Sequence, residues 1–146
     1  MRVKARAVIL IEGRLIVAEQ LRRGRPELSL PGGRVNQRES VPDALRREVA
    51  EETGLDVTPG RLLYVFEMVQ AVRIHDLELI FLAHATGIPG LGGYTAIDLD
   101  AAERPPVRPP ILEQIVSDRA SAWRDTPRWL GNLSQGTGRH MRSEAG

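Results

Sequence analysis

The chain has 146 residues and a mass of 16.2 kDa, which fits one domain with a short tail. Its composition is 42% hydrophobic and 27% charged, so it has enough apolar side chains for a core and is not wholly disordered. The formal net charge of +1 gives no sign of a nucleic-acid-binding surface, and the absence of cysteine excludes disulfides, thiolate catalysis and cysteine-bound metals. No segment approaches the roughly 18 apolar residues of a membrane span, so we expect a cytoplasmic protein with neither a nucleic-acid nor a membrane partner.

Apolar runs and turn residues divide the chain into strands and helices. Runs rich in Val, Ile and Leu predict strands over residues 3–11, 14–19, 28–30, 61–69 and 76–85. Glu12-Gly13 predicts a hairpin turn, residues 21–27 a polar loop, and Pro31-Gly32-Gly33 the end of the third strand. Helices are expected over residues 41–53 and 110–123. This order of elements predicts an α/β (α+β) sandwich around a mixed β-sheet.

Two stretches are expected to lack regular structure. Residues 87–108 are rich in Gly and Pro and predict a long connection. Within it, Gly87 to Gly93 lacks the Lys-Ser/Thr ending of a phosphate-binding loop and is interpreted as a flexible connector. Residues 131–146 are polar and rich in Gly and Ser, so they predict a flexible C-terminal tail after a domain spanning residues 1–130.

The helix over residues 41–53 has clear signals at both ends. Ser40 can act as its N-cap, Pro42 fits the first turn, and Asp43 can complete a capping box. Gly54 follows the last helical residue and is typical of a C-terminal stop.

Glutamates occupy the face of this helix that should pack against the core. At about 100° per residue the apolar stripe consists of Val41, Ala44, Leu45 and Val49. Glu48 and Glu52 fall within the same stripe and Glu51 lies on its flank, so the three carboxylates can converge. Because clustered carboxylates repel and are costly to bury unpaired, we expect a hard cation among them, Mg²⁺ first and Mn²⁺ as the alternative. A solvated face of an acidic helix is the competing interpretation.

These glutamates belong to a longer pattern. It reads Gly33, five residues, Glu39, seven residues, Arg47-Glu48-Val49, one residue, Glu51-Glu52, one residue, Gly54-Leu55. This 23-residue stretch resembles the box that defines the Nudix hydrolase superfamily, and all nine specified positions match. If each of the seven fixed identities occurs at roughly one residue in ten, a given start position matches by chance about once in 10⁷.

The residues before the box agree with the resemblance in part. Leu30-Pro31-Gly32-Gly33 is typical of the family, whereas the aromatic residue that frequently precedes this run is absent, since Ser29 stands between Leu28 and Leu30. The resemblance implies a mixed sheet sandwiched between helices, with the box forming a loop and then a helix. That agrees with the elements expected from the residues alone.

The resemblance also implies roles for individual box residues. Glu48, Glu51 and Glu52 would be the metal ligands and catalytic carboxylates, and a backbone carbonyl of Gly32 or Gly33 would add a further oxygen. Arg47 would hold a box glutamate in place through a charge-assisted hydrogen bond, with Glu39 in the same network. Gly33 and Gly54 would be needed for the shape of the backbone.

Family members hydrolyse a nucleoside diphosphate linked to another group, so the resemblance implies a Mg²⁺-dependent nucleotide pyrophosphatase with a small-molecule nucleotide substrate. Many relatives pair as homodimers, which leaves that assembly open here. The competing hypotheses are a non-catalytic, regulatory nucleotide-binding Nudix domain and an interaction domain with an acidic helix. The intact Glu-x-x-Glu-Glu motif favours the enzyme, because a pure binding module has no need of a clustered metal site.

Several other residues are candidates with open roles. For the general base we favour a box glutamate, with Asp98, Asp100 and Glu103 as alternatives, although these three acids are interpreted first as solvated loop residues. Arg22, Arg23 and Arg25 precede the box and could clamp substrate phosphates or lie in a loop without a role. Tyr64 and Phe66 are interpreted as core, with stacking on a nucleobase as the alternative for one of them.

The substrate is not specified by the known subfamily signatures. No proline lies near Gln70, as in the group that cleaves ADP-ribose, and no tyrosine stands at Val72 or Arg73, as in the group that cleaves dinucleoside polyphosphates. A nucleoside triphosphate or a compound similar to a nucleotide sugar remains open.

Overall fold

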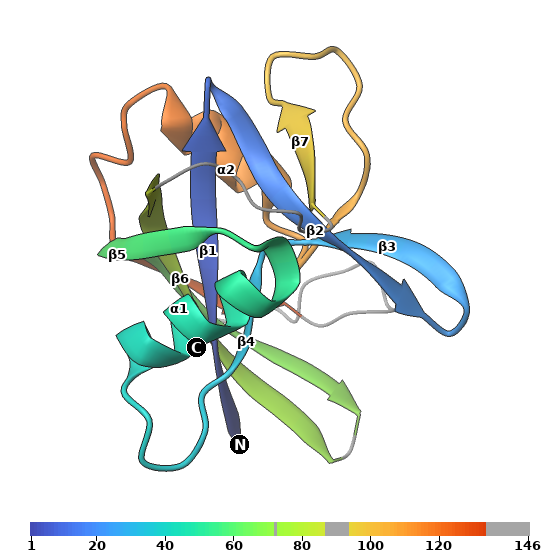
Figure 1. The fold of residues 1–146 in the computed structure, drawn as a ribbon, viewed down its shortest axis with the longest axis vertical. Helices are drawn as coiled ribbons and strands as arrows, with labels where there is room; N and C mark the ends of the chain where they lie inside the picture. Colours follow the sequence, from blue (N-terminus) through green and yellow to red (C-terminus); the bar gives the residue numbers. More distant parts are fainter. Residues whose placement is uncertain (72, 87–93, 134–146) are drawn as a thin grey trace.

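A mixed β-sheet with one helix on each face forms the centre of the molecule (Figure 1). The computed structural model describes residues 1–71, 73–86 and 94–133. The strands of this part are β1 Arg2–Ile11, β2 Arg14–Arg22, β3 Arg25–Ser29, β4 Gly32–Arg34, β5 Asp56–Ala71, β6 Ile74–Thr86, β7 Tyr94–Asp98, β8 Val107–Arg108 and β9 Arg128–Asn132. The helices are α1 Val41–Thr53 and α2 Leu112–Arg119. This arrangement confirms the predicted fold class.

The sheet combines parallel and antiparallel pairs. The strand order is β8-β3-β2-β1-β6-β5-β9, with β4 paired to β1 and β7 paired to β2. β1 and β6 run parallel, whereas β1–β2, β2–β3 and β5–β6 are antiparallel. The central position of β1 places it between α1 in front and α2 behind (Figure 1).

The two helices cover separate apolar cores on opposite faces of β1. Leu45 and Val49 of α1 pack in a cluster that contains Ala7 of β1. The cluster under α2 contains Ile115 of that helix and Val8 of β1. Because successive strand residues point to opposite faces, even-numbered residues of β1 lie on the α2 side. This alternation decides where the charged residues of β1 are found.

The ends of α1 agree with the sequence signals. The Ser40 hydroxyl accepts a hydrogen bond from the Asp43 amide at 3.2 Å, which confirms the N-cap. Gly54 has a left-handed backbone with φ 75°, and its N–H donates to the carbonyl of Ala50. The helix therefore begins and ends at the predicted residues.

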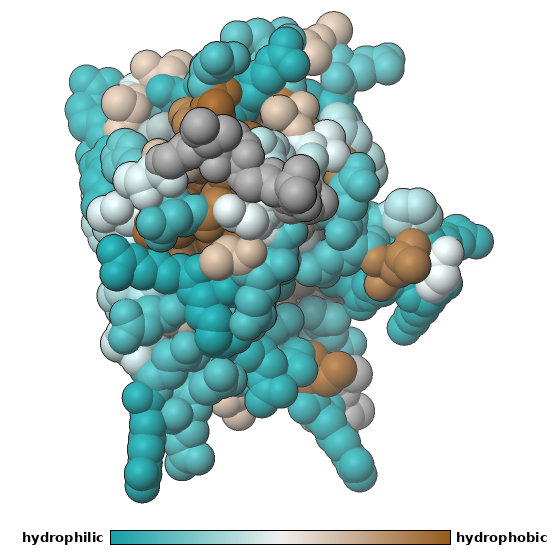
Figure 2. All heavy atoms as spheres, viewed as in Figure 1, coloured by the Kyte–Doolittle hydropathy of each residue, from teal (hydrophilic) through white to brown (hydrophobic). Residues whose placement is uncertain are grey.

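The polar loop predicted over residues 21–27 is wrong. The segment forms a hairpin in which β2 extends to Arg22 and β3 begins at Arg25. Arg23 and Gly24 form its two-residue turn with φ 53° and 75°, both positive, as in the turn at Glu12 and Gly13. The hairpin projects from the body of the molecule in Figures 1 and 2.

Other boundaries also differ from the prediction. β5 begins at Asp56 rather than 61, and the helix expected over 110–123 is shorter, since α2 spans Leu112–Arg119. The connection expected over 87–108 contains β7 and β8, which pair with β2 and β3; the connector Gly87–Gly93 lies outside the described residues.

At the C-terminal end, β9 continues through Asn132, two residues into the predicted tail. Residues 134–146 of that tail lie outside the described part of the chain. Among the helices of residues 1–71, 73–86 and 94–133, none is long and apolar enough to cross a membrane.

Candidate functional site

The predicted metal-binding residues lie where α1 packs against Gly32 and Gly33, the first two residues of β4, which we call the Gly32-Gly33 loop. Gly32 and Gly33 pair with Arg6 and Ala5 of β1, which holds this loop against the sheet. A Cβ at Gly32, whose φ is 144°, would lie 2.1 Å from the carbonyl oxygen of Ala5. A Cβ at Gly33 would lie 2.6 Å from the carboxyl carbon of Glu48. Gly32 therefore requires glycine because its backbone packs against β1, whereas a side chain at Gly33 would displace the Glu48 carboxylate that lies directly over it.

Glu52 faces the same loop from the last turn of α1. Its Oε1 accepts a hydrogen bond from the Gly32 N–H at 2.9 Å, and its Oε2 accepts one from the Gln20 side chain at 2.7 Å. Burial raises the pKa of Glu52 to about 6, and the negative charge of Glu48 adds to the rise, although the Gly32 hydrogen bond and Arg6 oppose it. The Glu52 carboxylate is thus held next to Gly32 in a partly buried position, where its ionised form is destabilised.

The raised pKa of Glu52 predicts a pH-dependent stability of the metal-free protein. The folded state binds this proton more tightly than the unfolded chain does, so the stabilising contribution is complete below about pH 4.5 and is lost as the pH rises through about 6. Glu52→Gln removes that loss, and we expect the variant to melt higher than the wild type at pH 7.5 in EDTA but not at pH 4.5. Thermal melts of both proteins across this range measure the difference; equal melting temperatures at pH 7.5 would contradict it.

Arg47 joins the helix to the residues that precede it. Its guanidinium donates to both carboxylate oxygens of Glu39, at 2.8 and 3.0 Å, and to Oε1 of Glu48 at 3.0 Å. It also donates to the carbonyl of Arg34, just after the glycines. These bonds raise the pKa of Arg47 and, with the Asn36 amide, lower the pKa of Glu39 to about 2. Glu48 is consequently oriented through a charge-assisted network that spans the whole loop.

The third glutamate is less constrained. Glu51 is 60% exposed, and its carboxylate lies 3.6 Å from the Arg47 guanidinium. In the part of the chain that the structure describes, no three His, Cys, Asp or Glu side chains are already grouped as a metal site. Glu48 pairs with Arg47, and Glu52 with Gly32 and Gln20.

The donor set nevertheless fits a hard divalent cation. Carboxylates of Glu48 and Glu52 both lie against Gly32 and Gly33, and carboxylate oxygens are the ligand type that Mg²⁺ and Mn²⁺ prefer. Burial is the main cause of the raised pKa of Glu52, with a smaller contribution from the charge of Glu48, and a bound cation would favour the ionised carboxylate. Figure 2 shows a mainly hydrophilic surface around α1.

A basic pocket of about 340 Å³ adjoins Glu52 and was not predicted. Gln20 lines it and contacts Glu52, and Arg6 lines it and donates to the carbonyl of Leu30 just before the glycines. Its cations are Arg2, Lys4, Arg6, Arg22 and Arg108. Arg2, Lys4 and Arg6 occupy alternate positions of β1 on the α2 face. This alternation is the one feature of the sequence that indicates the pocket.

The structure separates the three predicted phosphate-clamping arginines. Arg22 lines the basic pocket, whereas Arg23 and Arg25 are exposed at the turn of the β2–β3 hairpin and are not among the described pocket residues. Their role in substrate binding stays a prediction. Tyr64 and Phe66 are completely buried under α2, so both belong to the core rather than to a nucleobase site.

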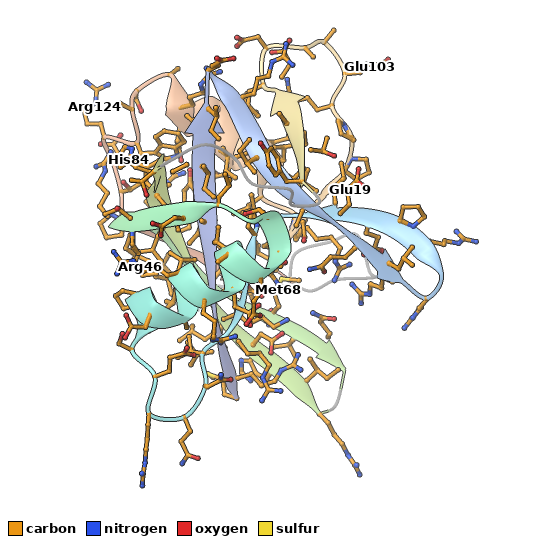
Figure 3. The ribbon with its side chains drawn as sticks, viewed as in Figure 1. Glu19, Arg46, Met68, His84, Glu103 and Arg124 are labelled. Atoms are coloured by element: carbon orange, nitrogen blue, oxygen red, sulfur yellow. The ribbon has the colours of Figure 1, made fainter. Side chains whose placement is uncertain are left out.

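The alternative general bases lie away from α1. Asp98 ends β7, and Asp100 pairs with Arg119 of α2 at 3.4 Å. Glu103 lies at the far end of the molecule from α1, while Arg46 marks that helix in Figure 3. The placement favours a box glutamate over these three acids.

Comparison with known proteins agrees with the fold and the site. The chain matches the NUDIX domain over residues 1–104. It is 44% identical over 73 residues to 8-oxo-dGDP phosphatase NUDT18 of Danio rerio; the aligned part is 50% of this chain and 21% of that protein, so the chain spans about a fifth of the curated relative.

Two solved structures extend the comparison. The MutT NUDIX hydrolase from Burkholderia pseudomallei is 28% identical with a TM-score of 0.63, covering 78% of this chain and 97% of that chain. A NUDIX hydrolase from Nitrosomonas europaea has a TM-score of 0.69 at 18% identity, covering 92% of this chain and 79% of that chain, which shows the shared fold. Together with the complete box and its geometry, these matches show that the chain belongs to the Nudix family.

Proposed function

We propose that this protein hydrolyses a pyrophosphate bond in a nucleoside diphosphate linked to another group, with Mg²⁺ or Mn²⁺ as cofactor. The observation that carries the proposal is the placement of Glu48 and Glu52 over the Gly32-Gly33 loop, beside a pocket rich in cations. A diphosphate needs positive charge on its oxygens and an activated water, and a cation held by carboxylates together with the arginines nearby supplies the first requirement.

Each residue of the site has a distinct task in this proposal. Glu48, Glu51 and Glu52 hold the cation, with the Gly32 carbonyl as a further oxygen ligand. When bound, the cation neutralises phosphate oxygens and lowers the pKa of a water molecule. One box glutamate accepts the proton of the attacking water. Arg47 is a positioning residue, because it contacts Glu48 and Glu39 rather than the substrate.

Arg6 is proposed to bind the substrate between the glutamates of α1 and the basic pocket. Its guanidinium donates to Glu78 at 2.7 Å and to the Leu30 carbonyl at 3.1 Å, and it contributes positive charge next to Glu52. A planar guanidinium fixed by two bonds is preorganised to accept phosphate oxygens on its remaining donors. Arg6 would therefore stabilise the leaving phosphate without losing further side-chain entropy, because its guanidinium is already held in place.

The relatives suggest which nucleotides to test first. The Danio rerio relative is named for a phosphatase activity on 8-oxo-dGDP, and a structural neighbour from Streptococcus suis is named an ADP-ribose pyrophosphatase. We therefore place nucleoside diphosphates, nucleoside triphosphates, ADP-ribose and nucleotide sugars among the candidate substrates.

The test is hydrolysis of this panel by the purified protein with 5 mM Mg²⁺ (on the order of physiological total magnesium) and with EDTA. We expect a nucleoside monophosphate product from at least one compound, at a kcat of roughly 1–100 s⁻¹, and no product in EDTA. Cleavage that is unaffected by EDTA would contradict the metal assignment. A nucleotide that raises the melting temperature without being cleaved would instead establish a regulatory binding domain.

The cytoplasmic location and the homodimer found in many relatives stay predictions. Cell fractionation tests the first. Light scattering on the purified protein tests the second, for which a molecular mass near twice 16.2 kDa is the expected value for a dimer.

A further inference from the structure

Among the described residues, the basic pocket beside Glu52 brings together more cations than carboxylates. Arg2 and Lys4 share Asp76, at 2.6 and 3.4 Å. Arg6 pairs with Glu78 at 2.7 Å. Arg22 and Arg108 share Glu27, at 3.9 and 3.5 Å. In the part of the chain that the structure describes, five cations thus face three carboxylates.

Burial first, and the neighbouring cations second, disfavour the charged forms of two residues in the pocket. Burial lowers the pKa of Lys4, and the neighbouring charge of Arg6 lowers it further. Burial likewise lowers the pKa of Arg108, with a further contribution from Arg22. Charged groups held close together in a partly buried pocket repel one another, and an anion placed between them would remove that repulsion.

The buried hydroxyl of Ser29 also supports the binding of an anion in this pocket. Ser29 lines the pocket and is 5% exposed, and its Oγ has no hydrogen-bond partner among the described residues. Buried polar atoms are nearly always satisfied, so this hydroxyl is available to a ligand. A serine hydroxyl beside arginine guanidinium groups offers the donors that a phosphate oxygen accepts.

The lining also argues against a flat, apolar ligand. None of the described residues around the pocket is aromatic, so no ring is present on which a nucleobase could stack. A volume of about 340 Å³ nevertheless exceeds what one phosphate needs, which leaves space for the sugar or chain that carries it.

The pocket lies next to the proposed catalytic site, and Gln20 connects the two. Gln20 lines it and donates to Oε2 of Glu52 at 2.7 Å, while Glu52 contacts the Gly32 amide. A diphosphate bound at the glutamates would therefore place the group linked to it beside the pocket.

We propose that this pocket binds a phosphate monoester carried by the part of the substrate beyond the diphosphate, so that the enzyme prefers diphosphate esters with such an additional phosphate. The proposal rests on the pyrophosphatase function proposed above. It deepens that function because it names the substrate class: the linked group is itself anionic, not a neutral sugar.

The first experiment measures phosphate binding without catalysis. Inorganic phosphate in EDTA, at an ionic strength held constant with chloride, should raise the melting temperature of the wild type by about 3–5 °C at a concentration ten times its Kd. The double variant Arg22→Gln, Arg108→Gln should lose most of this shift. Arg124→Gln removes an exposed positive charge outside the pocket and should keep it.

Phosphate also stabilises proteins non-specifically, and the variants separate the two effects. An equal shift in the double variant, or no shift in the wild type, overturns the proposal. If the double variant does not fold, Ser29→Ala gives the same test, because it retains every cation and removes only the unpartnered hydroxyl. We expect it to weaken phosphate binding severalfold, and unchanged binding would overturn the role of the pocket.

The second experiment compares substrates that differ by one phosphate. ADP-ribose 1″-phosphate against ADP-ribose is a suitable pair for steady-state hydrolysis with Mg²⁺, because the two differ only by a phosphate monoester on the linked ribose. The wild type should prefer the phosphorylated member at least tenfold in kcat/KM, mainly through KM, and the double variant should bring the ratio close to one. Equal rates on both members, or cleavage only of compounds without an additional phosphate, overturns the preference.

The two proposals fail in different ways. If no compound is cleaved by the wild type with metal, the pyrophosphatase function fails and the substrate preference fails with it, whereas the phosphate-dependent melting shift still reports on the pocket. If compounds are cleaved but the extra phosphate has no effect, only the inference about the pocket fails.

Discussion

Glu52→Gln is expected to lower kcat by about 100- to 1,000-fold, corresponding to a loss of about 3–4 kcal/mol of transition-state stabilisation. Glutamine keeps the size of the side chain, and its carbonyl oxygen can still accept the hydrogen bond from the Gly32 amide, which is 2.9 Å long in the wild type. The substitution therefore leaves the loop in place and removes only the charge that a divalent cation needs. Glu48→Gln should cause a loss of similar size, with the added effect of weakening the bond to Arg47 at 3.0 Å.

The measurement is kcat on the best substrate of the panel at saturating Mg²⁺, with circular dichroism to verify the fold. Glu12→Gln is a matched control, because it removes one carboxylate from an exposed hairpin turn outside the site. Activity close to that of the wild type in both Glu48→Gln and Glu52→Gln would show that the glutamates do not hold the catalytic metal. A loss confined to KM would assign them to substrate binding alone.

The helix that carries these residues could be predicted from sequence because its signals are local. Ser40, Gly54 and the apolar stripe lie within fifteen or so residues, and capping and helical periodicity act over that range. The glutamates stood out because they break the amphipathic pattern. Conflicts between a local pattern and its expected packing are typical of functional sites.

The sequence pattern does not predict the β2–β3 hairpin, and one reason lies in the backbone of its turn. Arg23 adopts a positive φ of 53°, which is uncommon for a residue with a Cβ. Residues 19–21 are exposed at every position, so the strand has no alternation of buried and exposed side chains to reveal it. β7 and β8 were missed because they depend on pairing with β2 and β3, which lie about eighty residues earlier.

The basic pocket could not be predicted because its charges are assembled across the sheet. Arg2 and Arg6 bond to Asp76 and Glu78, which are 74 and 72 residues away. Parallel pairing of β1 with β6 brings these residues together, and no local pattern indicates that register. Near-neutral net charge also hides the pocket, since acidic residues elsewhere balance it in the total.

Addition of Mn²⁺ or Mg²⁺ to the metal-free protein is expected to raise its melting temperature. A ligand that binds only the folded state stabilises it by RT ln(1 + [L]/Kd), which is about 2.7 kcal/mol at a concentration one hundred times Kd. For a domain of this size that corresponds to about 5–10 °C. Millimolar Mg²⁺ lies closer to its Kd than Mn²⁺ does, so Mn²⁺ should give the larger shift.

The metal-dependent rise in melting temperature depends on the pH and on Glu48 and Glu52. Because the pKa of Glu52 is raised to about 6, protons compete with the metal at a higher pH than for an ordinary carboxylate. We therefore expect the metal-dependent shift to be complete above about pH 7, to weaken through pH 6 and to disappear below about pH 5. The Glu48→Gln, Glu52→Gln double variant should show no shift at any pH, whereas Glu12→Gln should respond as the wild type does.

A melting temperature that is indifferent to both metals at pH 7.5 would distinguish two arrangements of the site. In the first, the substrate's phosphates complete the coordination, because Glu51 is exposed and no three acidic side chains are grouped among the described residues. In the second, the glutamates are a solvated helix face without a ligand. A non-hydrolysable nucleotide diphosphate analogue separates them: with metal present, only the first arrangement gives a shift larger than that of the analogue in EDTA, and that added shift should be lost in the double variant.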